Sequence, residues 1–119
     1  MNEKQHFSTT QKKYLRELAM LAKKITAYLD EFKFHYAAEL LYHYTWHTFA
    51  DKIVEEVKTQ LMSDNADTRA QNALFLLEMY ATLLKMLHPF MPFATEEIWA
   101  MLPAAQKRKN LLMVERWPV

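Results

Sequence analysis

The 119-residue chain contains no glycine, and this absence restricts its possible folds more than any other feature. Ordinary usage would give roughly eight glycines in a chain of this length. Without them the phosphate-binding P-loop, the dinucleotide-binding turn and the usual tight β-hairpins are excluded, because each depends on glycine's conformational freedom. The absence therefore argues against a free-standing nucleotide-using enzyme and favours an all-α fold.

Cysteine is also absent, so disulfides and thiolate metal sites are excluded. No apolar run approaches the ~20 residues that cross a bilayer, and residues 1–10 are too polar for a signal peptide. We therefore expect a cytoplasmic protein without membrane contact. The formal net charge is only +1, so any binding of nucleic acid would have to come from local clusters of basic residues.

Apolar residues recur at helical spacing in four segments, which predicts an all-α, up–down bundle of four main helices. We expect these helices over about 11–31, over 34–61, from a cap at 67 or 68 to 87, and over 94–102. The third is apolar on nearly every side, so it should be the buried helix of the bundle. The caps of the first and third helices are expected at Ser8, Thr9 or Thr10 and at Asp67 or Thr68, respectively. Residues 1–119 are expected to form one domain, with an ordered part of about 10–118.

The second helix is expected to bury a stripe that includes Trp46 and Phe49. The other members of this stripe are Ala38, Leu41, Tyr42, Thr45, Ile53 and Val57.

A proline-rich corner is expected between the third and fourth helices, within residues 83–99. Pro89 and Pro92 each remove a backbone donor and disfavour helix in the residue before them. The side chains expected to fill this corner and the next turn are Phe90, Met91, Phe93 and Trp99. After the last helix, residues 111–114 form a short apolar segment that could lie extended.

Two groups of polar residues could be mistaken for reactive sites. His43, His47 and Asp51 stand at i, i+4 spacing, which can hold a metal. No second helix offers an obvious further ligand, so packing histidines are favoured and no metal site is predicted. Glu96 and Glu97 are adjacent and point about 100° apart on a helix, so they are interpreted as charge at a helix N-terminus rather than as an acid/base pair. No catalytic residue and no cofactor is predicted.

Basic residues gather at one end of the expected bundle, where the first and third helices start, the second ends and the chain after the fourth should lie. These residues are Lys12, Lys13, Arg16, Lys58, Arg69, Lys107, Arg108 and Lys109. This end sums to +3 and the opposite end to −2. Proteins recognise unstacked RNA bases by stacking on aromatic or guanidinium planes and by hydrogen bonds to base edges. The candidate RNA-binding residues are Lys12, Lys13, Tyr14, Arg16, Arg69, Asn72 and Phe75, with Tyr14 or Phe75 as the stacking ring. An ordinary solvated surface is the alternative.

Three stretches of the chain resemble a known family. The motif HPFMPF running into TEEIW is the most specific, and it resembles the corner of the anticodon-binding domain of class I aminoacyl-tRNA synthetases, closest to valyl-tRNA synthetase. Leucyl and isoleucyl enzymes have similar corners that depart more from HPFMPF. The pattern Phe34-x-x-Ala37-Ala38-x-x-x-Tyr42 with Trp46-x-x-Phe49-x-Asp51 resembles the family's second helix, and Trp117-Pro118 resembles its closing Trp-Pro. Together these stretches span roughly residues 10–118.

The resemblance implies a domain that grips the anticodon arm of tRNA, while the parent enzyme attaches valine to that tRNA using ATP. Its partners would be tRNA and the catalytic domain of the parent synthetase. The family's two ATP-site signatures, HIGH and KMSKS, are absent from this sequence, so the chain itself is expected to be non-catalytic. The alternatives are a helical protein-interaction domain that kept the bundle without RNA binding, the equivalent domain of a leucyl or isoleucyl enzyme, and a small metalloenzyme using His43 and His47.

Overall fold

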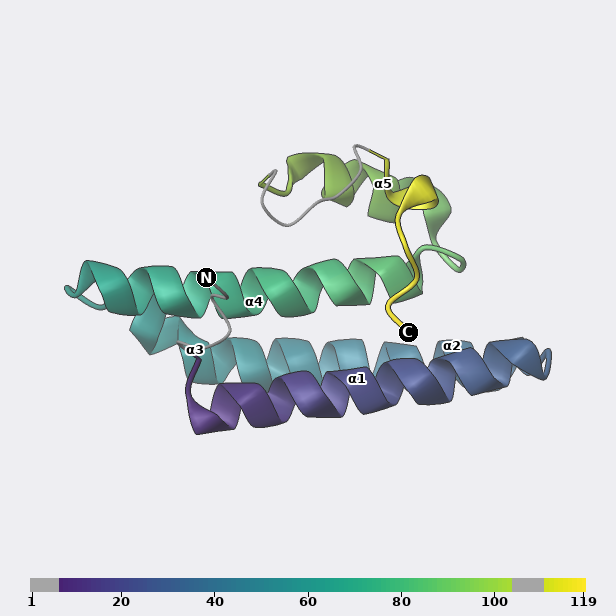
Figure 1. Cartoon of the computed structure of the whole chain (residues 1–119), viewed down its shortest axis with the longest axis horizontal. Helices are drawn as coiled ribbons and strands as arrows, with labels where there is room; N and C mark the ends of the chain where they lie inside the picture. Colours follow the sequence, from purple (N-terminus) through teal and green to yellow (C-terminus); the bar gives the residue numbers. More distant parts are fainter. Residues whose placement is uncertain (1–6, 104–110) are drawn as a thin grey trace.

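The computed structural model describes residues 7–103 and 111–119, and the fold they form is a helical bundle (Figure 1). The elements are α1 (Thr9–Asp30), α2 (Phe34–His43), the π-helix η2 (Tyr44–Ile53), α3 (Val54–Leu61), α4 (Ala66–Leu87), α5 (Pro92–Met101) and the short 3-10 helix η4 (Leu112–Val114). Because α2, η2 and α3 follow one another without a break, they form one long helix. The predicted all-α bundle of four main helices is confirmed.

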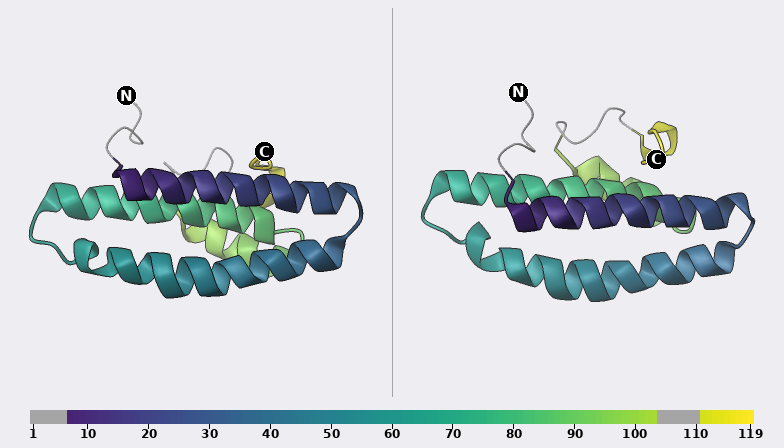
Figure 2. Two further views of the ribbon diagram at one scale, coloured as in Figure 1. Left: turned by 90° about the horizontal axis from the view of Figure 1, so that it is seen from below. Right: turned by 60° about the horizontal axis from the view of Figure 1, so that its bottom comes forward.

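The three long helices run antiparallel, and α5 folds back along α4 (Figures 1 and 2). Between separate helices, the most extensive contacts join α1 with α2, α3 with α4, and α4 with α5, and α1 also packs on α4. The resulting molecule is elongated, with extents of 47 × 27 × 25 Å. Among the described residues, no helix is both long and apolar enough to span a bilayer.

The core has two parts that meet on α4. The main cluster joins the three long helices and includes Leu18 and Ile25 of α1 with Phe75 and Met79 of α4. The second cluster lies between α4 and α5 and consists of Ala81, Leu84, Trp99, Leu102 and Leu112. α4 therefore buries side chains on two sides, as its nearly continuous apolar sequence predicts.

Side-chain caps begin α1 and α4. The Ser8 hydroxyl accepts from the Gln11 backbone N–H, while the Gln11 side chain accepts from the Ser8 backbone N–H. This reciprocal pair is a capping box, and it confirms Ser8 among the predicted caps. The cap of α4 is Asn65, whose Oδ1 accepts from the next residues' N–H groups at 2.9 and 3.2 Å. These N–H groups belong to Asp67 and Thr68, so the prediction that one of these two residues is the cap was wrong.

The turn from α1 to α2 uses a residue where glycine is usual. Phe32 has φ of 59°, the only positive φ of a non-glycine residue in the described chain. The Lys33 N–H donates to the Tyr28 carbonyl at 2.8 Å and the Phe32 N–H to the Leu29 carbonyl at 3.0 Å. This is the Schellman arrangement, in which the left-handed residue closes the helix.

The middle of the second long helix corrects the expected stripe. The buried residues of this helix are Ala37, Leu41, Phe49, Ile53 and Val57, four or eight positions apart. A π-helix has more residues per turn than an α-helix. For this reason η2 holds one row of residues inward, instead of the two rows that a 3.6-residue period predicts. The prediction for Phe49 is confirmed, since it is buried and stacks on Tyr80 with 6.1 Å between ring centroids. The prediction that Trp46 belongs to the core was wrong, since its side chain is 53% exposed.

The corner between α4 and α5 contains the two prolines but is filled differently from the prediction. α5 begins at Pro92, so the fixed φ of proline starts the helix. Trp99 is fully buried and Phe90 half-buried, as expected, whereas Phe93 is 87% exposed. The prediction for Phe93 was wrong because the helix starts two residues earlier than expected and turns this ring outward.

Because α5 starts at Pro92, Glu96 and Glu97 lie beyond its first turn, which contains no acidic residue. Their interpretation as charge at the helix N-terminus was therefore wrong. The Glu96 carboxylate binds backbone instead, since it accepts from the Leu112 N–H at 2.6 Å and the Met113 N–H at 3.1 Å. Beside this corner, His88 Nδ1 lies 2.9 Å from the buried Thr95 hydroxyl.

The C-terminal segment lies at a different end of the bundle from the one expected. Residues 112–114 form η4 rather than an extended strand, and η4 packs on α5. The Trp117 indole N–H then donates to the Thr26 hydroxyl at 2.7 Å, late in α1. The expectation that this segment joins the start of α1 was wrong, because Glu96 and Thr26 hold it near the other end (Figure 1).

Candidate nucleic-acid interface

The start of α1, the end of α3 and the start of α4 meet at one end of the molecule, on the left in Figure 1. The Gln11 side-chain amide donates to Asn72 Oδ1 at 2.7 Å, which joins α1 to α4. The Tyr14 hydroxyl donates to Glu56 Oε2 at 2.5 Å, which joins α1 to α3. The up–down prediction for these three segments is therefore confirmed.

The cationic side chains predicted here are on the surface. Lys12, Lys13 and Arg16 are exposed on α1, and Arg69 is exposed in the first turn of α4. The Arg69 guanidinium donates to the Ser63 carbonyl at 2.6 Å, so the loop before α4 holds it in place. The basic residues expected from the linker, Lys107, Arg108 and Lys109, lie outside the described residues.

The net positive charge predicted for this end is not found in its described part. Residues 7–17 carry two more basic than acidic side chains, and residues 49–72 carry two more acidic than basic ones. Residues 111–119, which were expected at this end, lie elsewhere. The net charges of the two remaining segments therefore cancel. The positive charge is instead spread along α1.

This surface of α1, which we name the α1 basic face, consists of the exposed residues Lys12, Lys13, Arg16, Lys23 and Lys24. Between residues 9 and 29 the only acidic side chain is Glu17. Lys23 and Lys24 lie in the second half of α1, toward the opposite end of the bundle. Their spacing from Arg16 of seven and eight residues, about two helical turns, was the signal that they share its face.

Three of the predicted RNA-binding residues belong to the core. Phe75 is fully buried and packs edge-on against Phe7, with ring centroids 5.9 Å apart. Tyr14 is 7% exposed, and its ring lies 6.4 Å from that of Phe75. Neither ring offers a free face for a base, so the prediction of stacking on them was wrong. The buried Asn72 side chain is also occupied, since it accepts from Gln11 and donates to the Thr68 carbonyl at 2.8 Å.

The Tyr14 hydroxyl has a structural role beneath the α1 basic face. Its hydrogen bond to Glu56, together with burial, raises the pKa of Tyr14 to about 12. The phenol therefore stays protonated and acts as a donor. The Lys52 ammonium lies 5.8 Å from the centroid of the same ring, where it gains a cation–π contact.

The histidine group considered as a metal site remains on the surface. His43 and His47 lie side by side with 4.7 Å between ring centroids, and His47 Nδ1 is 3.8 Å from Asp51 Oδ2. Within residues 7–103 and 111–119, no group of three or more potential ligands is arranged to hold a metal ion.

Comparison with known proteins gives consistent results. Residues 11–119 match the family described as the anticodon-binding domain of tRNA ligase. The valine–tRNA ligase of Syntrophotalea carbinolica is 40% identical over 84 residues, which are 71% of this chain and 9% of that protein. The valine–tRNA ligase of Agrobacterium fabrum is 34% identical over 105 residues, or 87% of this chain and 11% of that protein. That of Prochlorococcus marinus is 31% identical over 118 residues, or 99% of this chain and 13% of that protein. The chain thus spans about a tenth of the length of these relatives.

Proposed function

The chain belongs to the anticodon-binding domain family of tRNA ligases, and from this membership we propose that it binds the anticodon arm of tRNA for a valine–tRNA ligase. In this role residues 1–119 act as one helical domain in the cytoplasm, where proteins are synthesised. The attachment of valine, driven by ATP, is carried out by the catalytic part of the parent enzyme. The observation that carries the proposal is the family match over residues 11–119.

The choice of valine rests on the relatives. The proteins compared above are valine–tRNA ligases from three different bacteria, at 31–40% identity. This favours a valyl parent over the leucyl and isoleucyl alternatives.

The first part of the α1 basic face, which consists of Lys12, Lys13 and Arg16, is the surface best suited to an RNA backbone, because Arg69 of α4 is exposed at the same end of the bundle. Lysine and arginine side chains that contact phosphates release condensed counterions, and this release supplies much of the affinity of proteins for nucleic acid. Because the rings of Tyr14 and Phe75 are buried, stacking on unpaired bases would fall to the exposed guanidinium groups of Arg16 and Arg69 at this end.

A matched pair of double variants tests this surface. Lys12→Glu with Lys13→Glu reverses two adjacent exposed charges near the start of α1, and Lys23→Glu with Lys24→Glu makes the same change about 16 Å along the same helix. The affinity of each variant for a valine-tRNA anticodon stem-loop is measured at two salt concentrations. We expect the first pair to weaken binding more than the second and to flatten its salt dependence.

The outcomes separate specific from diffuse binding. Equal losses in the two variants would leave only general electrostatic attraction, because two charge reversals weaken the attraction to any polyanion. A larger loss from the second pair would move the site toward the middle of α1. No binding of the wild-type chain at low salt would contradict the proposed function itself.

A further inference from the structure

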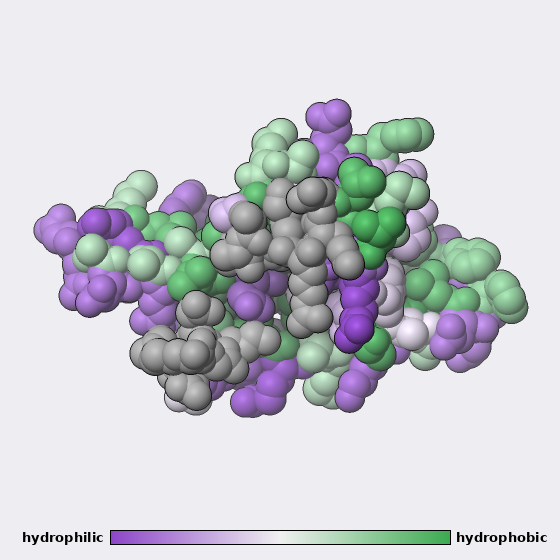
Figure 3. All heavy atoms as spheres, turned by 45° about the horizontal axis from the view of Figure 1, so that its top comes forward, coloured by the Kyte–Doolittle hydropathy of each residue, from purple (hydrophilic) through white to green (hydrophobic). Residues whose placement is uncertain are grey.

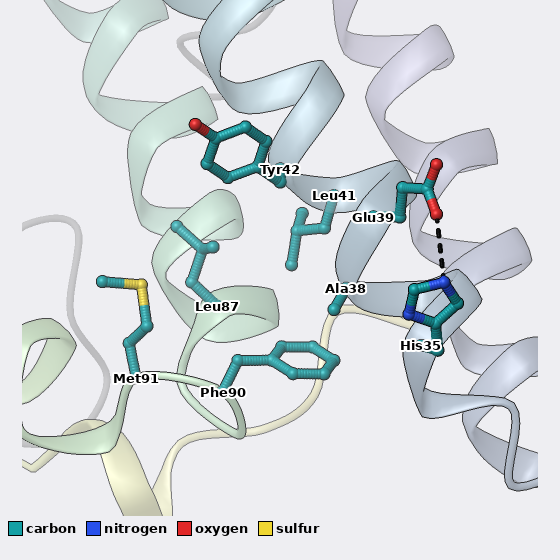
Figure 4. Close-up of a pocket in the computed structure, with 8 residues that line it drawn as sticks. All are labelled: His35, Ala38, Glu39, Leu41, Tyr42, Leu87, Phe90 and Met91. Carbon is teal, nitrogen blue, oxygen red and sulfur yellow. Dashed lines mark ion pairs between the residues drawn. The ribbon is translucent and has the colours of Figure 1, made fainter.

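An apolar groove lies on the other side of the bundle from the α1 basic face, between α2 and the corner that joins α4 to α5. It has a volume of about 440 Å³. Figure 4 shows Ala38, Leu41 and Tyr42 of α2 across from Leu87, Phe90 and Met91. Tyr42 is 63% exposed and Met91 51% exposed, so the groove is open to solvent.

Aromatic side chains extend this groove along η2. The Trp46 ring lies 6.2 Å from that of Tyr42, one turn further along the helix. The larger number of residues per turn in η2 moves Trp46 out of the core and places it beside Tyr42. At the corner, the exposed Phe93 follows Met91 in sequence, and apolar side chains are also visible over α5 in Figure 3. We name the groove together with Trp46 the α2 groove.

The composition of the α2 groove is that of a protein interface. Interfaces between proteins are enriched in aromatic residues and methionine and are depleted of lysine. Large contiguous apolar patches on a protein surface mark sites of interaction with other molecules. The π-helix that presents Trp46 is itself rare and is found frequently at functional sites.

The charge around the groove disfavours RNA. The two segments that border it, residues 34–51 and 86–103, contain four carboxylates and no lysine or arginine. A polyanion would find no lysine or arginine on these two segments, whereas the α1 basic face would attract it. The bundle therefore has one surface suited to RNA and a different one suited to an apolar partner bordered by basic side chains.

We propose that the α2 groove docks against the remainder of the valine–tRNA ligase polypeptide, through an apolar surface with basic residues at its rim. This inference rests on the proposed function, because it takes the parent enzyme as the partner. The relatives are about ten times longer than the segment they share with this chain, so the equivalent domain belongs to a much larger polypeptide. Contacts between domains of one chain commonly bury roughly 600–1,500 Å². The α2 groove supplies the apolar centre of such a contact.

Side-chain footprinting with hydroxyl radicals tests the docking. A hybrid is made from the Agrobacterium fabrum valine–tRNA ligase, with the segment matched by this chain replaced by this chain, and its fold is checked by circular dichroism and gel filtration. Oxidation of Trp46, Tyr42 and Met91 is compared in the isolated chain and in the hybrid. Met20 and Met62, which are 70% and 79% exposed, serve as internal controls away from the groove. We expect severalfold protection of the three groove residues in the hybrid and none of the two controls.

Three other outcomes of the footprinting contradict the proposal. Equal oxidation of the groove residues in both proteins would show that the groove stays open. Protection that grows with the concentration of the isolated chain would identify a second copy as the occupant. Protection of the groove by the anticodon stem-loop would make it an RNA surface. Failure of the stem-loop to bind either protein would contradict the proposed function while leaving the docking result intact.

A pair of variants gives a second readout. Trp46→Ala with Met91→Ala should lower the melting temperature of the hybrid but leave that of the isolated chain nearly unchanged, because these side chains are exposed only in the latter. Met20→Ala with Met62→Ala should change neither. An unchanged melting temperature of the hybrid in the first variant would contradict docking through this groove.

Discussion

Phe32 occupies a backbone position that suits glycine, and its cost can be measured. A residue with a Cβ atom loses about 1–2 kcal/mol in the left-handed conformation, and the Phe32 side chain is 79% exposed, so burial returns little of this energy. We expect Phe32→Gly to stabilise the domain by about 0.5–1 kcal/mol, after allowing for the greater freedom of glycine in the unfolded chain. Urea denaturation followed by circular dichroism measures the change. Phe32→Ala is the control, since it removes the ring but keeps the Cβ atom, and it should not stabilise.

Tyr14 links the stability of the bundle to alkaline pH. Its pKa is raised from 10.0 to about 12, first by the hydrogen bond to Glu56 and then by burial. A raised pKa stabilises the fold below the unfolded value and loses that effect as the pH rises through the folded value. We expect Tyr14→Phe to cost about 1.5–3 kcal/mol at pH 8, since a hydrogen bond to a carboxylate is lost. The difference from wild type should shrink between pH 10 and 12.

Denaturation midpoints measured from pH 8 to 12 check this expectation. Tyr42→Phe is the matched control, because its ring is exposed and it should leave the midpoint at pH 8 unchanged. A difference between wild type and Tyr14→Phe that stays constant up to pH 12 would show that the bond to Glu56 does not set the pKa of Tyr14.

At the scale of the helix, Trp46 and Trp99 form a natural comparison. Trp99 is fully buried between α4 and α5, and Trp46 is half-exposed on η2. We expect Trp99→Ala to cost about 3–5 kcal/mol, as for other large buried side chains. Trp46→Ala in the isolated chain should change the free energy of unfolding by only about 0.5 kcal/mol. Chemical denaturation followed by far-ultraviolet circular dichroism avoids the loss of fluorescence in both variants. Similar losses would mean that Trp46 packs inward.

The sequence predicted helices well because their signals are local. Apolar periodicity, caps and prolines act within a few residues, so Ser8, the start of α2 at Phe34 and the corner at Pro89 were all found within one or two positions. The π-helical turns of η2 were missed because they depend on contacts with other helices. An error of a fraction of a turn is enough to place Trp46 in the same buried row as Phe49, whereas the structure buries Phe49 alone of the two.

The candidate site was predicted less well, since it depends on which side chains reach the surface. The exposed positions of Lys12, Lys13, Arg16 and Arg69 were expected from their charge. The rings of Tyr14 and Phe75 are equally compatible with core and with stacking in a sequence pattern, and packing decided for the core. The path of the C-terminal segment depends on the bonds from Glu96 to Leu112 and Met113, sixteen and seventeen residues away. No local pattern reports such contacts.

At the scale of the whole molecule, the described residues separate charge and apolar surface onto different sides. The α1 basic face carries five exposed cationic side chains, and the segments around the α2 groove carry none from lysine or arginine. A small overall charge of +1 hides this separation. A domain placed between an RNA and a larger protein would use such an arrangement, because each surface then repels or fails to attract the other's partner.

The two core clusters also divide the molecule into parts of different stability. α5 makes its main contacts with α4 and η4. The buried side chains of α4 in the second cluster are Ala81 and Leu84, and the partly buried Leu77 and Tyr80 pack against them. The three long helices share a larger cluster that does not include α5. Segments with fewer buried contacts open without global unfolding. We therefore expect α5 and residues 111–119 to open together, at a lower free energy than α1 and α4.

Native-state hydrogen exchange of the wild-type chain and two variants tests this expectation. Glu96→Ala removes the acceptor that holds Leu112 and Met113, so exchange should become faster in α5 and residues 111–119 while the slowest amides of α1 and α4 keep their rates. Glu97→Ala changes a neighbouring exposed carboxylate on the same helix and should have little effect. If Glu96→Ala instead speeds exchange equally in all helices, the domain opens only as one unit. The bond from Glu96 would then contribute to global stability rather than to the docking of the C-terminal segment.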